Sequence, residues 1–172
     1  MANIKDAVDF TLRQEDSTMS GAITGSANDR GGRTRFGIAE VWHPDLTKTG
    51  FYSTMDTADA LDVAENILAN QYATPLMLAS ISDQGVATAL LSMAVVEGNV
   101  EAVKCLQGAV GAVQDGQMGP NTLAAVNVAT NVMQKFAALE DVYFRSIVAK
   151  DPTQAKWIKG WLNRVTAVQA LA

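Results

Sequence analysis

Two carboxylates and a threonine lie near the start of the chain, at positions that could support acid–base chemistry. Glu15 falls where an amphipathic helix is expected to end, Asp29 follows a loop rich in small residues, and Thr34 comes five residues later. Glycosidic bonds are usually hydrolysed by two carboxyl groups: one donates a proton to the leaving oxygen, and the other activates water or stabilises the developing cation. The pattern is compatible with this chemistry, with the Thr34 hydroxyl orienting the water.

The expected surroundings of Glu15 suit a proton donor. Glu15 continues the apolar stripe of the helix and lies at its C-terminal end, where the helix dipole disfavours a negative charge. Both effects favour the protonated carboxyl. Gly31 and Gly32, which follow Asp29, permit a tight turn and the close approach of a sugar to the backbone. The spacing alone leaves a second interpretation open, in which these carboxylates are solvated surface residues.

Arg33 and Arg35 would crowd this site, and two roles are open for them. Their guanidinium groups could bind carboxylates of a substrate, which would place them with the glycine pair in a substrate-binding set. They could equally balance local acids such as Asp16 and Asp29.

Apolar residues recur with a helical period along most of the chain, so we expect a mainly α-helical protein. The first helix is expected at residues 3–15, followed by a loop at 16–35 with a small irregular hairpin and by a turn at 36–42. Either Ser53 or Thr57 could cap the second helix. Asp83 is expected to cap a third, whose inward residues would be Val86, Leu90, Met93 and Ala94.

The second half of the chain is expected to hold three more helices. One runs from Val100 to Val110 with Val100 facing inward. Pro120 is placed to open a helix, and the helical period continues from there to about Lys150 as one long element. Asp151 would cap the final helix. In that helix Trp157 and Trp161 are expected in the core, with stacking on sugars as the alternative.

Composition and charge argue against several classes of function. With 172 residues and a net charge of −5, the chain suits one compact domain and not a nucleic-acid binder. Residues 142–172 carry five basic side chains and one acid, so this end could contact an anionic surface weakly or simply face solvent. The single His43 and single Cys105 leave almost no material for a histidine-based triad or a metal site. We expect no cofactor and no metal.

Several segments carry a more specific signal, because they occur in order along most of the chain. The segment Asn28–Ile38 resembles the Asp-Pro-Gly-Gly-x-Thr-x-Tyr-Gly-Ile signature of the muramidases of glycoside hydrolase family 108. Three later segments resemble the predicted peptidoglycan-binding region that accompanies these enzymes: Ala102–Gly111, Asp115–Asn127 and Gly160–Val165, the last reading Gly-Trp-Leu-Asn-Arg-Val.

The resemblance implies a lysozyme-like helical fold and a muramidase of the phage endolysin type, which cleaves between N-acetylmuramic acid and N-acetylglucosamine in peptidoglycan. By this comparison Glu15 is the general acid, Asp29 and Thr34 position the water, and the reaction inverts the anomeric centre. It also implies a catalytic lobe at 1–82 and a peptidoglycan-binding lobe at 83–172, packed together as one compact domain.

Partners and location follow from the same comparison. We expect a monomer that acts on peptidoglycan glycan strands. Residues 1–6 lack the apolar run of a secretion signal, so we expect synthesis in the host cytoplasm and action on the cell wall after release by another factor.

Two other functions stay open at this stage. A non-catalytic peptidoglycan-binding or virion protein could retain the same fold. Asp16-Ser17 supports this alternative, because the related enzymes have Gly-Gly after the catalytic glutamate. A lytic transglycosylase also needs one glutamate acid, but it needs no water-positioning pair, so Asp29 and Thr34 count against it.

Overall fold

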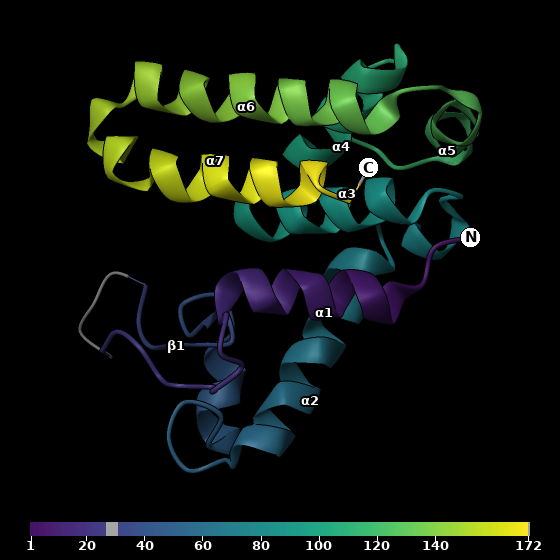
Figure 1. Cartoon of the computed structure of the whole chain (residues 1–172). Coiled ribbons are helices and arrows are strands. Elements are labelled where there is room, and N and C mark those ends of the chain that lie inside the picture. Colours follow the sequence, from purple (N-terminus) through teal and green to yellow (C-terminus); the bar gives the residue numbers. More distant parts are fainter. Residues whose placement is uncertain (27–30, 172) are drawn as a thin grey trace.

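The computed structural model describes residues 1–26 and 31–171. It is mainly α-helical with a small antiparallel hairpin after the first helix, as the sequence predicted (Figure 1). The principal elements are α1 (Ile4–Glu15), β1 (Thr34–Arg35), β2 (Ile38–Ala39), α2 (Thr57–Ile67), α3 (Gln84–Glu97), α4 (Asn99–Val110), α5 (Pro120–Val128), α6 (Val132–Lys150) and α7 (Ala155–Gln169). Short 3-10 or π turns occupy Pro44–Thr49, Leu68–Ala73, Leu78–Ser80 and Pro152–Gln154. No helix in the described ranges is both long and apolar enough to cross a membrane.

Side-chain caps explain where the early helices begin. Asn3 accepts a hydrogen bond from the Lys5 backbone at the start of α1, and Asp83 accepts one from Val86 at the start of α3, as predicted for Asp83. The expected caps of α2 were wrong. Asp56 caps this helix, because its extended backbone lets its carboxylate accept from the Asp59 N–H.

Helix α3 forms the centre of the molecule and packs against α1, α4, α6 and α7. In Figure 1, α1 crosses the middle of the view, with α2 and the hairpin below it and α6 and α7 above. The predicted inward residues of α3 are all buried, and so is every residue from Gly85 to Ala94. Because α3 is covered on all sides, it can hold elements from both halves of the chain in fixed positions.

The expected single helix from Pro120 to Lys150 is wrong. The chain forms α5 and α6 as separate helices, and α5 is seen nearly end-on beside the long α6 (Figure 1). Ala129 leaves the helix with an extended backbone, and Asn131 adopts φ +56° in the left-handed region. Asparagine tolerates this region better than most residues, so the reversal is built into a stretch that otherwise keeps a helical period.

Helices α6 and α7 lie antiparallel and are joined by a tight turn. Asp151 accepts hydrogen bonds from the backbone and hydroxyl of Thr153 and from the Gln154 amide. It caps the 3-10 turn Pro152–Gln154 that leads into α7, and not α7 itself as predicted. Trp161 stacks on Phe144 with ring centroids 5.1 Å apart.

Two residues expected to face the core do not. Trp157 is 54% exposed, and Val100 is 53% exposed at the start of α4. Val100 packs beside the Gly116 turn, where a β-carbon at Gly116 would lie 2.7 Å from it.

Candidate active site

Glu15 is the last residue of α1 and is held by an arginine from the other end of the chain. Arg164 Nη2 donates to Glu15 Oε1 at 2.5 Å, and Arg164 Nη1 donates to Ser92 Oγ at 3.3 Å. The side chains of Arg164 and Glu15 are only 10% and 22% exposed, so this ion pair is sheltered from solvent. Charge-assisted hydrogen bonds of this kind fix geometry well. Helices α1, α3 and α7 therefore meet at the Glu15 carboxylate.

The hairpin turn presses directly on Glu15. Phe36 and Gly37 connect β1 to β2 with φ values of +50° and +78°, the pattern of a two-residue type I′ turn. A β-carbon at Gly37 would lie 2.5 Å from Glu15 Cγ, so glycine is required by both backbone and space. The hairpin was expected within residues 16–35. Its second strand lies instead at Ile38–Ala39, where only a turn was predicted.

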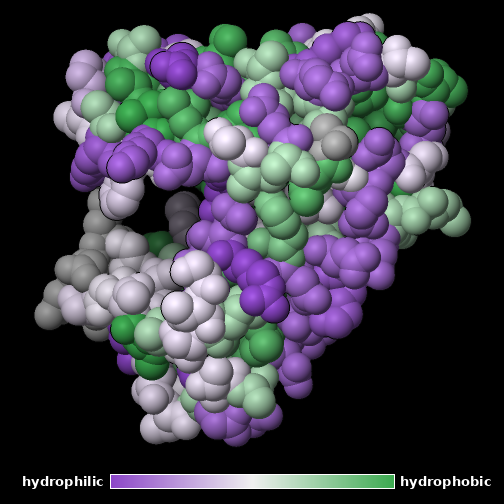
Figure 2. Space-filling model, viewed as in Figure 1, coloured by the Kyte–Doolittle hydropathy of each residue, from purple (hydrophilic) through white to green (hydrophobic). Residues whose placement is uncertain are grey.

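Glu15 and Gly37 line two adjoining hollows. The larger, which we call the α7 cleft, has a volume of about 470 Å³ and is lined by Gln14, Glu15, Gly37, Val95, Val96, Trp157, Gly160, Trp161, Asn163 and Arg164. The smaller, the hairpin cleft, has about 180 Å³ and is lined by Glu15, Asp16, Ser20, Ala22, Thr24, Thr34, Phe36 and Gly37. Figure 2 shows the surface hollowed between the α6–α7 layer and the hairpin segment below it. A polymer bound across both clefts would pass the Glu15 carboxylate.

Thr34 lies in the hairpin cleft together with Glu15. Its backbone N–H and C=O both bond to Thr24, at 2.8 and 2.9 Å, which fixes its position at the start of β1. Its hydroxyl forms no hydrogen bond with the described part of the chain, so it is available to a water or a substrate. Asp29, the third predicted catalytic residue, lies outside the described residues.

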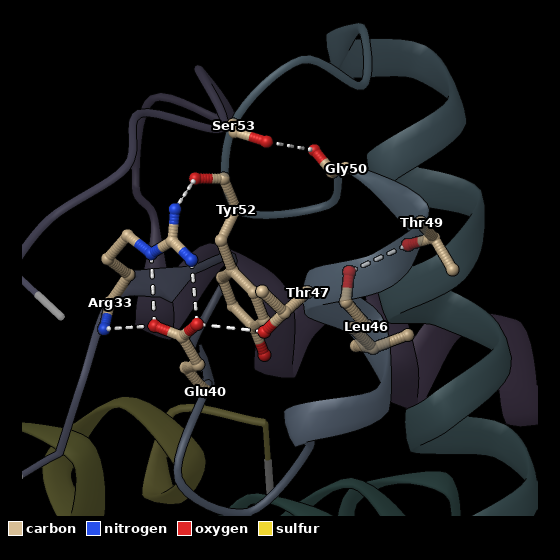
Figure 3. A network of polar contacts seen from close by, with 8 residues as sticks. All are labelled: Arg33, Glu40, Leu46, Thr47, Thr49, Gly50, Tyr52 and Ser53. Carbon is tan, nitrogen blue, oxygen red and sulfur yellow. Dashed lines mark hydrogen bonds and ion pairs between the residues drawn. The ribbon is translucent and has the colours of Figure 1, made fainter.

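Arg33 is engaged in a network of hydrogen bonds with Glu40 and Tyr52 (Figure 3). Its Nε and Nη2 donate to the two carboxylate oxygens of Glu40 at 3.0 and 2.7 Å, and its Nη1 donates to the Tyr52 carbonyl at 2.9 Å. Hydrogen bonds from Arg33 and Thr47 lower the pKa of Glu40 to about 2. Gly32, at φ +70°, makes room for Glu40, since a β-carbon there would lie 3.0 Å from Glu40 Cβ. Both residues thus serve the local fold, which favours the charge-balancing role for Arg33.

The contacts of Arg35 favour a role in the local fold over one in substrate binding. Arg35 is only 5% exposed, and it donates to the carbonyls of Gly21, Phe51 and Met55 at 2.8–3.0 Å. Its guanidinium thereby ties the hairpin to the loops around it. Gly31, by contrast, is exposed, and a β-carbon there would meet no atom within 4 Å, so its substrate-binding role stays a prediction.

Asp16, which follows Glu15, organises the loop after α1. Its carboxylate accepts hydrogen bonds from Thr18, Ser20 and the Gly21 N–H, the last at 2.7 Å. Burial raises the pKa of Asp16, but these hydrogen bonds together bring the pKa below its usual value. Asp16 therefore stays ionised and holds the backbone and side chains of the loop after α1 by hydrogen bonds.

Comparison with known proteins places this geometry in a family. The profile of the family described as Glycosyl hydrolase 108 matches residues 9–98, more than half of the chain. The chain belongs to glycosyl hydrolase family 108. A second profile, described as Predicted Peptidoglycan domain, matches residues 101–166. The protein is therefore a glycoside hydrolase, and peptidoglycan is the polymer on which it acts.

A solved structure supports the lysozyme-like architecture of this family 108 hydrolase. SagA of Brucella abortus is similar with a TM-score of 0.74 and 25% sequence identity, over 97% of this chain and 91% of that one. A search of curated proteins gave no match. The two family profiles meet near the junction of α3 and α4, whereas the sequence placed the lobe boundary at residues 82–83. The division into lobes stays a prediction.

Sequence reasoning missed the partner of Glu15 in this family 108 hydrolase. The Gly-Trp-x-x-Arg segment was quoted for its resemblance, but no role was given to Arg164, because a contact across 149 positions has no local signal. It also missed Glu140, which is fully buried on α6. Neither Glu140 carboxyl oxygen has a hydrogen-bond partner among the described residues.

Proposed function

We propose that the protein is a muramidase that hydrolyses the β-1,4 bond between N-acetylmuramic acid and N-acetylglucosamine, with Glu15 as the proton donor. One observation carries this proposal: the Glu15 carboxylate lies where the α7 cleft and the hairpin cleft adjoin, held in place by Arg164. A glycan strand lying across both clefts would present its scissile bond to this group.

The proposed reaction uses residues from both clefts. For this step Glu15 must carry a proton, so the ion pair with Arg164 becomes a hydrogen bond to a neutral carboxyl in the substrate complex. The proton then passes to the glycosidic oxygen as the bond from that oxygen to the anomeric carbon breaks. Arg164 stabilises the carboxylate that remains, because its guanidinium already lies within hydrogen-bond distance. A water placed by the Thr34 hydroxyl adds to the anomeric carbon and gives its proton to Asp29. The resemblance to family 108 supports the roles of Thr34 and Asp29. The phage origin and the endolysin role stay predictions.

Digestion of purified peptidoglycan tests the proposal. Wild type should release fragments with reducing-end muramic acid, and Glu15→Gln should lose this activity while it keeps its fold. Glu101→Gln is a matched control, because it makes the same chemical change at a residue paired with Lys104 and outside both clefts.

The products separate the alternatives. Anhydro-muramic ends, identified by mass spectrometry, would show a lytic transglycosylase. Binding of peptidoglycan without cleavage by wild type would show a non-catalytic protein. Thr34→Val should lower the rate strongly in a hydrolase and leave a transglycosylase nearly unchanged, because only hydrolysis needs a positioned water.

A further inference from the structure

One face of α7 forms a continuous wall of the α7 cleft. Trp157, Gly160, Trp161 and Arg164 follow one another at helical spacing, and all four line the cleft. Arg164 bonds to Glu15 at one end of this face, and Trp157 lies two turns away, about 10 Å along the helix axis. The wall therefore starts at the proposed acid and extends for the length of a short saccharide.

Gly160 has no reason within the protein to be a glycine. A glycine in a helix interior costs about 1 kcal/mol relative to alanine. The other glycines inside described α-helices, Gly85 and Gly108, are closely packed, since a β-carbon would meet neighbours at 3.0 and 3.1 Å. Among the described residues, a β-carbon at Gly160 would meet no atom within 4 Å, and its φ is not in the left-handed region. The missing side chain therefore leaves open space on the cleft side of α7.

The tryptophans on either side of Gly160 differ in how they are used. One face of the Trp161 ring stacks on Phe144, with an angle of 15° between the two ring planes. Trp157 is 54% exposed although it lines the cleft, and the Lys156 ammonium lies 5.1 Å from its ring centroid. An exposed indole in a concave wall is a platform for the apolar face of a sugar ring, because it offers a large flat surface at little entropic cost.

Two amide side chains complete the polar part of the cleft. Asn163 on the α7 wall and Gln14 on the α1 wall both line it, and neither side chain forms a hydrogen bond within the described part of the chain. Each amide offers two donors and an acceptor, which suits the N-acetyl group and hydroxyls of an amino sugar. Free amides beside an exposed indole and a bare helix backbone are the set of contacts that an N-acetylated sugar requires.

We propose that the α7 wall is a binding subsite for an N-acetylhexosamine ring of the glycan strand, next to the bond cleaved at Glu15. Trp157 is the stacking platform, Gly160 allows the ring to approach the helix backbone, and Asn163 and Gln14 bind its polar groups. This inference rests on the proposed function, because the glycan is taken to cross the Glu15 carboxylate.

Binding of a peptide-free tetrasaccharide of alternating N-acetylglucosamine and N-acetylmuramic acid tests the subsite. Calorimetric titration in the Glu15→Gln background prevents turnover. Trp157→Ala should weaken binding at least about tenfold. Trp42→Ala is the matched control, since Trp42 is 80% exposed and lines neither cleft, and it should leave the affinity unchanged.

Gly160→Leu gives the sharper result. Leucine is a better helix former than glycine, so the melting temperature should stay the same or rise, while the side chain fills the cleft and weakens binding at least about tenfold. Unchanged affinity in Gly160→Leu, or equal affinities in Trp157→Ala and Trp42→Ala, would overturn the subsite while leaving the proposed function intact. Digestion of peptidoglycan by Glu15→Gln itself would instead refute the proposed function.

Discussion

The buried carboxyl of Glu140 should make this protein less stable as the pH rises, and Glu140→Gln should remove that effect. Glu140 is fully buried, and its carboxyl oxygens have no hydrogen-bond partner among the described residues. Desolvation raises its pKa to about 8, with Arg164 lowering the pKa and Glu97 raising it. The ordinary pKa of glutamate is 4.5. Between these two values the folded chain keeps a proton that the unfolded chain releases.

The sign follows from this proton balance. Because the folded state binds the extra proton, the free energy of unfolding falls by up to about 1.4 kcal/mol per pH unit from pH 4.5 to 8. The cumulative loss is about 3 kcal/mol at pH 7 and levels off near about 5 kcal/mol above pH 8. Glutamine is neutral at every pH and has nearly the same shape. Glu140→Gln should therefore gain about 2.5 kcal/mol on wild type between pH 5 and pH 7, because the loss in wild type is already about 0.8 kcal/mol at pH 5.

Urea unfolding followed by far-UV circular dichroism at pH 5, 6, 7 and 8 measures this difference directly. Glu101→Gln is again the matched control, because Glu101 is partly exposed and paired with Lys104, and it should not show this pH-dependent gain. A difference between Glu140→Gln and wild type that is the same at all four pH values would refute the reasoning. It would mean that the folded protein holds Glu140 ionised, with Arg164 compensating fully for its burial.

Three further changes test the frame around the site. Gly37→Ala should abolish peptidoglycan digestion and lower the free energy of unfolding by more than about 1 kcal/mol in thermal melts. The reason is that residue 37 has a positive φ and that the new β-carbon would collide with Glu15. Full activity of this variant would contradict the turn geometry. Asp83→Ala should cost about 1 kcal/mol by loss of the α3 cap, with the specific activity of the folded protein retained. Glu40→Gln should lower the melting temperature at pH 7 and have little effect at pH 2, since the contribution of the ionised carboxyl is lost as the pH falls through its pKa of about 2. An equal effect at both pH values would argue against the Arg33 pairing.

The elements with local signals could be predicted from the sequence. The helical period gave α1 nearly to the residue and placed Glu15 at its end, and the acidic cap Asp83 gave the start of α3. The break between α5 and α6 was not predicted, because it depends on one residue, Asn131, which adopts the left-handed region within a stretch of otherwise helical apolar spacing. The spacing of apolar residues shows which face of a helix is buried. It does not show that the chain turns between two helices when the apolar spacing continues unbroken across the turn.

The candidate site was predictable only in part. Glu15 and Thr34 lie in the same cleft, as expected, because both belong to neighbouring elements of the first half. The sequence left two roles open for Arg33 and Arg35, because a guanidinium has the same sequence signature whether it binds a substrate or groups of the protein itself. Arg35 became structural through contacts with Gly21, Phe51 and Met55, which only the folded chain brings together. The role of Arg164 was not predicted for the same reason: only the folded chain brings it to Glu15, which lies 149 positions away in the sequence.

The ion pair between Glu15 and Arg164 bears on whether the regions matched by the two family profiles can work as separate modules. The profile that defines the hydrolase ends before α4, yet the side chain that holds its acid comes from the region matched by the peptidoglycan profile. The two regions are therefore not interchangeable parts, as a catalytic module and a tethered wall-binding module would be. Expressing the first half by itself would separate the acid from its counter-ion and remove one wall of the α7 cleft. Engineering of wall specificity in this protein must keep α7 with α1.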